Sequence, residues 1–345
     1  MGMEPAFERA PSSGAKYELL CSLSSGPVGA LSLGRTRGEG DAGRFVMLRS
    51  LPVASFAELE VSVRRAASIA HPRLMKVLGL AWVDEAPYLA SEYVEGLSAG
   101  DLGRELASAE TSAMQEVALR IGLDSLNAVT AARAELRARG VQELPRCLYP
   151  DTAWIATFGE TLLSDVGVAA ELVSHSAGST RDQAWSAPRG RGANAAKDDV
   201  FAAGALLFEL ISGRALSTVR DHETAAIPAL SELPRHGLPI AKPLVDLVKR
   251  ALAPEPKRRF QDPEEMAQAI LALPEHWIGS EAQVQAAIET LAHRATNLKA
   301  SEPSLELTSG EHLVDDLWEV PTRSLRLRLP SEEDERLTLV PEARK

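Results

Sequence analysis

The sequence predicts an α+β domain of two lobes, in which a small lobe rich in β-strands precedes a larger, α-helical lobe. Residues 45–48 and 88–90 are short apolar runs bounded by polar residues, a pattern typical of strands. Residues 114–139 carry apolar side chains at close to helical spacing. Residues 200–211 are apolar on nearly every side, which predicts a buried helix.

The remaining segments complete the predicted organisation. Apolar residues at helical spacing predict two further helices, over residues 264–273 and 282–298. From about Ala300 the chain is polar, acidic and interrupted by prolines, and such a composition buries too little apolar surface to fold alone. We therefore expect five parts: a disordered N-terminus (1–15), a β-rich lobe that ends in a hinge (16–96), a helical lobe (97–275), a helical extension (276–299) and a disordered tail (300–345).

The composition argues against several classes of protein. A formal net charge of −11 over 345 residues disfavours nucleic acid as the main partner, because phosphates require a basic face. Two distant cysteines, Cys21 and Cys147, supply no disulfide framework and fit a reducing compartment. Residues 1–15 lack the apolar core of a signal peptide, and no stretch approaches the roughly 20 apolar residues of a membrane helix. We therefore expect a cytoplasmic protein with no membrane partner.

Two segments carry most of the functional information. Asp165-Val166-Gly167 is similar to the Asp-Phe-Gly segment whose Asp holds the ATP-bound Mg²⁺ in protein kinases. Residues 145–152, Pro-Arg-Cys-Leu-Tyr-Pro-Asp-Thr, stand where a kinase carries His-Arg-Asp-Leu-Lys-Pro-x-Asn. With these, the chain resembles bacterial eukaryotic-like Ser/Thr protein kinases over about residues 17–275, which implies their two-lobed fold. The other similar segments are the glycine-rich loop (23–29), the third strand (45–49), helix C with its following turn (56–74), the hinge (88–96), the Ala-Pro-Glu position (187–189) and two later segments (199–214, 256–260).

The resemblance also implies which catalytic groups have been replaced. Cys147 stands at the catalytic Asp, which accepts the proton of the substrate hydroxyl. We expect an inert, partly buried thiol, and the alternative is a reactive nucleophile activated by a neighbouring group. Thr152 stands at the metal-binding Asn and offers a weaker Mg²⁺ ligand. Asp165 is retained as a vestige of the metal site, and we expect its side chain to cap backbone N–H groups in a turn.

The nucleotide-binding positions are altered as well. Arg49 stands at the third-strand Lys, and Ser62 falls at the helix C Glu that pairs with this Lys in the family. We expect Arg49 either to reach solvent along its apolar stem or to pair with a loop carboxylate. Met47 replaces a small Ala that lines the adenine slot, and it is expected to fill part of that slot. The vestige of the nucleotide site comprises Gly26, Gly29, Arg49 and Glu92.

Three further positions match the structural scaffold of the family. Arg146 keeps the arginine of the catalytic loop, and Asp199 matches an Asp that accepts hydrogen bonds from the backbone of that loop. Arg259 matches a buried Arg whose usual partner, the Glu of Ala-Pro-Glu, is Arg189 here. Because an unpaired buried charge is costly, we expect Arg189 to turn away and Arg259 to find another carboxylate.

These replacements predict a catalytically inactive kinase-like domain, or pseudokinase, that binds, scaffolds or regulates other proteins in signalling. A kinase works almost entirely by positioning and electrostatics, so the replacements remove the chemistry and leave the fold. We expect no cofactor, and protein partners such as an active kinase or another signalling protein. The alternative is a residually active Ser/Thr kinase that uses ATP and Mg²⁺ with Arg49, Asp165 and a substitute base, for which Asp151 is the nearest candidate. A transferase of other chemistry on the same fold is the third possibility.

Two short segments of the tail are candidate docking sites for a partner. Residues 313–318, Leu-Val-Asp-Asp-Leu-Trp, place apolar side chains at helical spacing with Trp318 as an anchor. Residues 324–329, Ser-Leu-Arg-Leu-Arg-Leu, alternate apolar and basic side chains, as a strand does when it adds to a sheet edge. The alternative is that both segments are solvated spacer or dock on their own domain.

Overall fold

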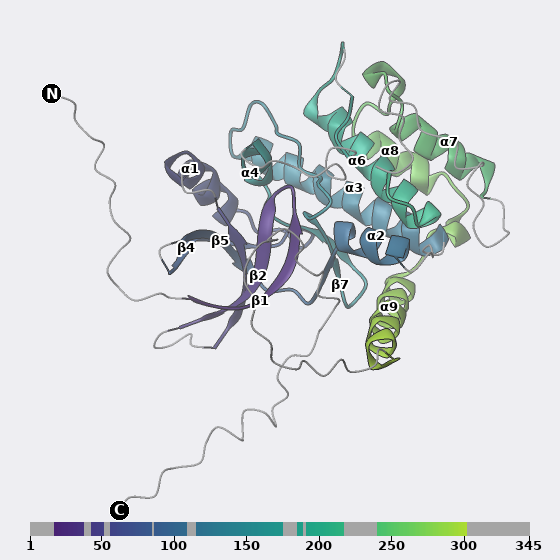
Figure 1. The fold of residues 1–345 in the computed structure, drawn as a ribbon. Coiled ribbons are helices and arrows are strands. Elements are labelled where there is room, and N and C mark those ends of the chain that lie inside the picture. The colour runs from purple at the N-terminus through teal and green to yellow at the C-terminus, as the bar shows by residue number, and fades with distance from the viewer. Residues whose placement is uncertain are drawn as a thin grey trace, which may run out of the picture. The chain divides into compact units, whose positions relative to one another are not determined.

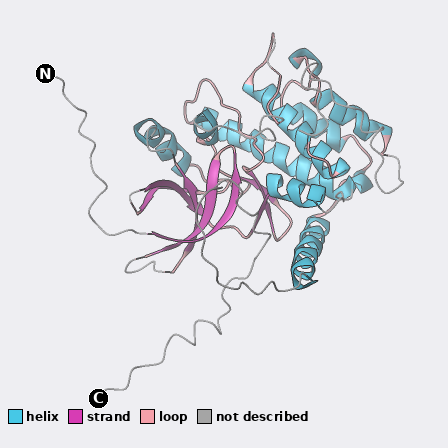
Figure 2. Ribbon diagram, viewed as in Figure 1, coloured by secondary structure: helices cyan, strands magenta, loops and turns pink. Residues whose placement is uncertain are grey.

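The structure of the protein is a computed structural model, shown in Figures 1 and 2. It describes residues 17–37, 43–51, 56–84, 86–108, 115–174, 185–188, 191–216 and 240–301, with the backbone alone at 56–58, 107–108, 174 and 292–301. The N-terminus predicted to be disordered lies outside the described residues, as does the predicted tail from residue 302 on, with its two docking segments. Residues 300–301 of the predicted tail belong instead to a helix. The chain divides into two compact units after Ala287, and both lobes belong to the first unit.

A five-stranded antiparallel sheet forms the N-terminal lobe, drawn in purple and blue in Figure 1. Its strands, in the spatial order β1-β2-β3-β5-β4, are β1 (Tyr17–Gly26), β2 (Gly29–Thr36), β3 (Phe45–Ser50), β4 (Val77–Val83) and β5 (Ala86–Glu92). Helix α1 (Phe56–Ala67) packs against this sheet. Its Leu59 and Val63 are buried in one core with Leu89 of β5. The strands predicted at residues 45–48 and 88–90 are confirmed as β3 and β5.

The C-terminal lobe is mainly helical, as the cyan ribbons of Figure 2 show. It contains a small antiparallel sheet of β6 (Gly96–Ser98), β7 (Ala153–Ala156) and β8 (Thr161–Leu163). Among its described residues, the helices are α2 (Ala99–Ser108), α3 (Gln115–Ala138), α4 (Ala169–Ser174), α6 (Ala195–Ser212), α7 (Lys242–Ala251) and α8 (Pro263–Leu271), with short 3-10 turns at η4 (Pro256–Arg258) and η5 (Glu275–Trp277). A further helix, α9 (Glu281–Ser301), follows η5. The predicted helices at 114–139, 264–273 and 282–298 are confirmed as α3, α8 and α9, each within a few residues.

The helix predicted to be buried is α6, which packs against α2, α3, α7 and α8. Every residue of α6 from Asp199 to Ser212 is buried, because the helix is apolar on almost all sides. Asn194 caps the first turn by accepting a hydrogen bond from the N–H of Lys197. Gly213 ends the helix in the left-handed conformation, with φ of 56°. The helix therefore holds Asp199 in a fixed position near its N-terminal end.

Two features are absent from the residues that the structure describes. In the part of the chain that the structure describes, no helix is both long and apolar enough to cross a membrane. Within the same residues, no group of three or more His, Cys, Asp or Glu side chains is arranged to hold a metal ion.

Candidate functional site

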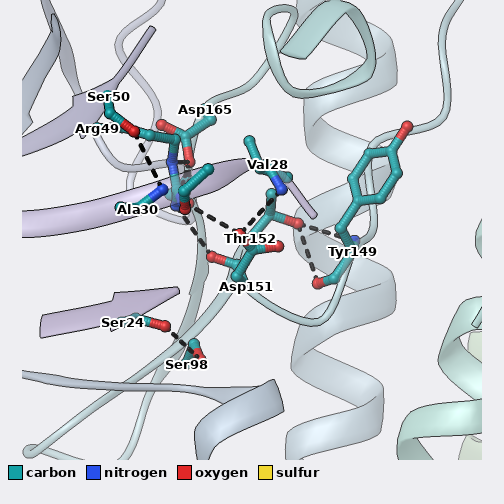
Figure 3. Close-up of polar contacts among 12 residues, drawn as sticks. Ser24, Val28, Ala30, Arg49, Ser50, Ser98, Tyr149, Asp151, Thr152 and Asp165 are labelled. Atoms are coloured by element: carbon teal, nitrogen blue, oxygen red, sulfur yellow. Dashed lines mark hydrogen bonds and ion pairs between the residues drawn. The ribbon is translucent and has the colours of Figure 1, made fainter. Parts of the chain in front are cut away.

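Arg49 of β3 is the centre of the candidate site, and its side chain is only 1% exposed (Figure 3). Its Nε and Nη2 atoms both lie 2.8 Å from Oδ2 of Asp165. Its Nη1 atom donates to Oδ2 of Asp151 at 3.1 Å and to the carbonyl oxygen of Gly29 at 3.0 Å. Nη2 also donates to the carbonyl oxygen of Asp151 at 3.2 Å. All three nitrogens therefore have acceptors, arranged as the planar guanidinium requires.

This geometry decides between the two sequence-based expectations for Arg49. Exposure of its head group to solvent is wrong, because the side chain is buried. Pairing with a carboxylate is confirmed, with Asp151 of the segment 145–152 and with Asp165 after β8. These partners lie 102 and 116 residues away along the chain.

The cluster of Arg49, Asp151 and Asp165 combines one cation with two carboxylates, a formal charge of −1 when all three are ionised. Burial raises the pKa of Asp151 to about 6, although Arg49 opposes this shift, and the charge of Asp165 adds to it. Burial also disfavours the cation of Arg49, but the two carboxylates outweigh it and raise the pKa of Arg49. Among the described residues, Oδ1 of Asp151 has no hydrogen-bond partner.

Asp165 adopts the left-handed backbone conformation, with φ of 54°. Its carbonyl oxygen accepts hydrogen bonds from the N–H groups of Val168 and Ala169, where α4 begins. Its carboxylate accepts a hydrogen bond from the hydroxyl of Ser164 at 2.7 Å, in addition to the bonds from Arg49. The segment is a turn, as expected, but the predicted side-chain cap is wrong, because the backbone carbonyl of Asp165 accepts these N–H groups while its carboxylate binds side chains.

The glycine-rich loop lies directly against this cluster. The N–H of Val28 donates to Oδ2 of Asp151 at 3.2 Å. A Cβ atom added at Gly26 would lie 2.7 Å from Cγ of Asp151, so only glycine allows the backbone to approach so closely. Gly29 has φ of 113° and contributes its carbonyl oxygen to Arg49. Ser24, near the end of β1, lies 3.4 Å from the hydroxyl of Ser98 in the C-terminal lobe.

The residue predicted to fill part of the adenine slot, Met47, lies in a buried apolar cluster. Met47 is 1% exposed and packs in one apolar cluster with Leu31, Met75, Trp154 and Leu162. The indole N–H of Trp154 donates to the carbonyl oxygen of Val94 at 3.0 Å, which fixes the ring in place. Sequence reasoning identified Met47 but missed Trp154, which stands out as the one bulky aromatic residue in the run Ala153-Trp154-Ile155-Ala156.

Cys147 and Thr152, which replace the catalytic Asp and the Asn, are both buried. Burial raises the pKa of the Cys147 thiol well above its ordinary value, and the nearby charge of Asp199 acts in the same direction. The thiol donates to the carbonyl oxygen of Pro145 at 3.5 Å. The Thr152 hydroxyl accepts from the N–H of Tyr149 at 2.9 Å and lies 3.1 Å from the carbonyl oxygen of Cys147. Both side chains thus serve the internal structure of the loop, and a neutral thiol is a weak nucleophile.

Helix α1 makes a contact that its sequence alone did not indicate. The hydroxyl of Ser62, at the position expected for a Glu, donates to Oε1 of Glu171 in α4 at 2.6 Å. Glu60 instead pairs with Arg64 on the surface of α1. Leu172 of α4 is buried in the same core as α1. The carboxylate beside α1 therefore comes from Glu171 of α4, and it accepts a hydrogen bond from the hydroxyl of Ser62.

Asp199 makes the hydrogen bonds that the family resemblance implies. Its Oδ1 accepts from the N–H groups of Cys147 and Leu148, at 2.8 and 2.9 Å. Its Oδ2 accepts from Nη1 of Arg133 at 3.1 Å, a partner that sequence reasoning did not identify. Complete burial raises the pKa of Asp199 to about 6, although these hydrogen bonds oppose the shift. Arg146, in the same loop, donates to the carbonyl oxygen of Leu148.

Two other predicted site residues, Glu92 and Arg259, bond to groups outside the Arg49 cluster. Oε1 of Glu92, at the end of β5, accepts from the N–H of Lys76 at 2.7 Å. Arg259 is buried and donates to the carbonyl oxygens of Ala253, Pro254 and Pro188. Its Nη1 atom also forms an ion pair with Oδ1 of Asp198 at 3.8 Å, so Arg259 finds another carboxylate as expected. Arg189 lies outside the described residues.

Three observations bear on the fit of a magnesium-bound nucleotide to this site. Asp165, which would hold the metal, is bonded to a guanidinium, and a chain cation so close to a metal position opposes its binding. Thr152 turns its hydroxyl toward the loop backbone. Met47, predicted to fill part of the adenine slot, is buried in one apolar cluster with Trp154.

The chain resembles known bacterial kinases. It is 26% identical over 214 residues to the serine/threonine-protein kinase PrkC of Bacillus subtilis (strain 168), a match that covers 58% of this chain and 31% of that protein. It is 26% identical over 286 residues to the tyrosine-protein kinase MasK of Myxococcus xanthus (strain DK1622), covering 76% of this chain and 44% of that protein. The chain thus spans less than half the length of these curated relatives. No protein-family model matches it.

Solved structures agree with the architecture described above. A crystal structure of the Mycobacterium tuberculosis PknI kinase domain is similar with a TM-score of 0.51 and 21% sequence identity. The similarity covers 79% of this chain and 99% of that domain. The fold of this chain is therefore the two-lobed fold of protein kinases, and its curated relatives are bacterial Ser/Thr and Tyr protein kinases.

Proposed function

We propose that this chain is a pseudokinase, a protein-kinase-like domain that transfers no phosphate and acts by binding other proteins. The observation that carries the proposal is the buried cluster of Arg49, Asp151 and Asp165. In a kinase, the third-strand Lys binds the nucleotide phosphates, and the Asp of Asp-Phe-Gly binds Mg²⁺. Here the corresponding cation and carboxylate bind each other, so neither is available to its usual ligand.

The loss of the catalytic base supports the same proposal. Kinases use an Asp to accept the proton of the substrate hydroxyl, and general-base help is typically worth roughly 10²–10⁴ in rate. Cys147 stands at that position, and its burial keeps the thiol protonated at neutral pH. Asp151, the substitute base considered from the sequence, is buried against Arg49 and the N–H of Val28. It is therefore poorly placed to reach a protein substrate.

The partners of the domain follow from what remains once catalysis is lost. The relatives PrkC and MasK are kinases by name, and we propose an active kinase or another signalling protein as the partner. The net charge of −11 disfavours nucleic acid. We propose a cytoplasmic setting and no cofactor.

The test is a phosphotransfer assay on the full chain with γ-labelled ATP and Mg²⁺, on itself and on generic protein substrates. We expect no incorporation by the wild type and none by Cys147→Asp, because Arg49, Ser62 and Thr152 also depart from the kinase pattern. Millimolar ATP with Mg²⁺ should leave the melting temperature unchanged, since only a ligand of the folded state raises it. Label transfer by the wild type that Asp165→Ala abolishes would establish the residually active kinase instead.

A further inference from the structure

The carboxylate of Asp151 lies between two groups that match the phosphate-binding groups of a kinase. One is the backbone N–H of Val28 in the glycine-rich loop, and the other is the guanidinium of Arg49 at the third-strand cation position. Both donate to the same oxygen, Oδ2 of Asp151, at 3.2 and 3.1 Å (Figure 3). A backbone N–H and a cation that converge on one anionic oxygen form the chemistry of a phosphate site.

We propose that Asp151 is a built-in substitute for a phosphate group, and that its removal uncovers a binding site for a polyphosphate anion beneath the glycine-rich loop. The inference rests on the proposed function, because it explains how the site is kept from its usual ligand. The site would consist of the N–H of Val28, the guanidinium of Arg49 and the space now taken by the Asp151 side chain.

Charge supports this assignment. With both carboxylates ionised, the cluster carries one positive and two negative charges, and it repels an added anion. Loss of Asp151 leaves one cation and one carboxylate, with formal charges that cancel. Arg49 then keeps Asp165 at 2.8 Å as a support that orients it, while its Nη1 atom loses the acceptor at 3.1 Å.

Packing of the loop supports it as well. Gly26 lies so close to Asp151 that an added Cβ would stand 2.7 Å from Cγ, so the loop is closed directly onto the carboxylate. Oδ1 of Asp151 is buried without a hydrogen-bond partner among the described residues, which shows that the enclosure binds one oxygen and leaves the other unsatisfied. A phosphate group is larger than a carboxylate, so the loop must lift slightly to accept it. At the near end of the loop, the hydroxyl of Ser24 lies 3.4 Å from that of Ser98 in the C-terminal lobe.

The experiment measures binding of inorganic triphosphate to the full chain by calorimetry, without and with Mg²⁺. We expect Asp151→Ala to bind at least about tenfold more tightly than the wild type, the scale of one hydrogen bond to a charged group. Triphosphate should also slow hydrogen exchange of the Val28 amide in this variant. ATP in a parallel arm separates the two sources of phosphate: Met47 and Trp154 fill the base slot, so ATP should bind no better than triphosphate.

The matched control is Asp124→Ala. Asp124 is also a buried aspartate with two arginine partners, Arg73 and Arg120, but it lies in α3 and does not touch the loop. We expect this variant to bind triphosphate no better than the wild type. Asp151→Asn keeps the shape of the side chain while removing its charge, and it should give a smaller gain in affinity for triphosphate. It takes the place of Asp151→Ala if that variant proves too unstable to purify.

Three outcomes would overturn the proposal. The first is that both Asp151 variants bind triphosphate with the affinity of the wild type. The second is that Asp124→Ala gains as much affinity as Asp151→Ala. The third is that the gain in affinity of Asp151→Ala survives when Arg49→Met is added. Failure of the proposed function is distinguishable, because it would appear as phosphate transfer by the wild type. If the wild type transfers no phosphate and the Asp151 variants bind triphosphate no better than the wild type, Asp151 is not a phosphate substitute and the pseudokinase proposal stands.

Discussion

Replacing Arg49 with methionine should strongly destabilise the N-terminal lobe and its junction with the catalytic loop. Methionine has similar bulk, but it leaves the carboxylates of Asp151 and Asp165, each with a side chain 3% exposed, without a cation. Removing one partner of a buried ion pair costs about 3–5 kcal/mol, since the remaining charge stays desolvated. The N–H of Val28 and the hydroxyl of Ser164 still bind the two carboxylates, so the loss should not exceed that range.

Urea unfolding at several pH values measures this effect. Without Arg49, Asp151 loses the cation that opposes the effect of burial, so its folded-state pKa should rise above its value of about 6. The folded variant then binds more protons than its unfolded chain, so its deficit is greatest at pH 8 and shrinks as the pH falls through that raised pKa. The matched control is Arg35→Met, which removes an exposed pair with Glu18 and should have little effect on stability, because solvent screens that pair. A cost for Arg49→Met as small as that of the control would refute the argument.

Three other predictions can be checked separately. The stability of Asp151→Asn relative to the wild type should increase from pH 5 to pH 8, because the folded-state pKa of Asp151 is about 6 and the ionised form carries the burial cost; a difference that stays constant in urea titrations across this range would contradict it. A thiol reagent should modify the exposed Cys21 in the native protein and the buried Cys147 only after unfolding, with Cys21→Ser as the control, and a second fast thiol would count against the inert interpretation. Truncation at Ala300 should leave the melting curve unchanged and reduce capture of a partner from native cells, whereas an unfolded product would make the tail part of the fold.

The sequence predicted the fold well because its motifs have fixed order and spacing. Segments such as 145–152 and 165–167 locate the catalytic loop and the metal position without any knowledge of contacts. The altered positions Cys147 and Thr152 could be named for the same reason. Asp199 could be assigned its partners because the family resemblance supplied a backbone contact that does not depend on catalysis.

The bonding inside the site could not be predicted in the same way. Arg49 had several carboxylates within reach in principle, and only the folded chain brings Asp151 and Asp165 to it from more than 100 residues away. The bond between Ser62 and Glu171 spans 109 residues and depends on how α4 packs beside α1. Trp154 was overlooked because an apolar residue in a short strand has no visible partner until the opposite lobe is placed above it.

The apolar cluster around Met47 also affects how the domain unfolds. Leu31, Met47 and Met75 come from the N-terminal lobe, while Trp154 and Leu162 come from the small sheet of the C-terminal lobe. In an ordinary two-lobed protein the cleft between lobes is a boundary between cooperative units, which open at different free energies. Here the boundary is itself a hydrophobic core, formed by side chains that both lobes contribute. Amides of β3 and of β7 should therefore exchange through one common opening, and the two lobes should unfold together as a single cooperative unit.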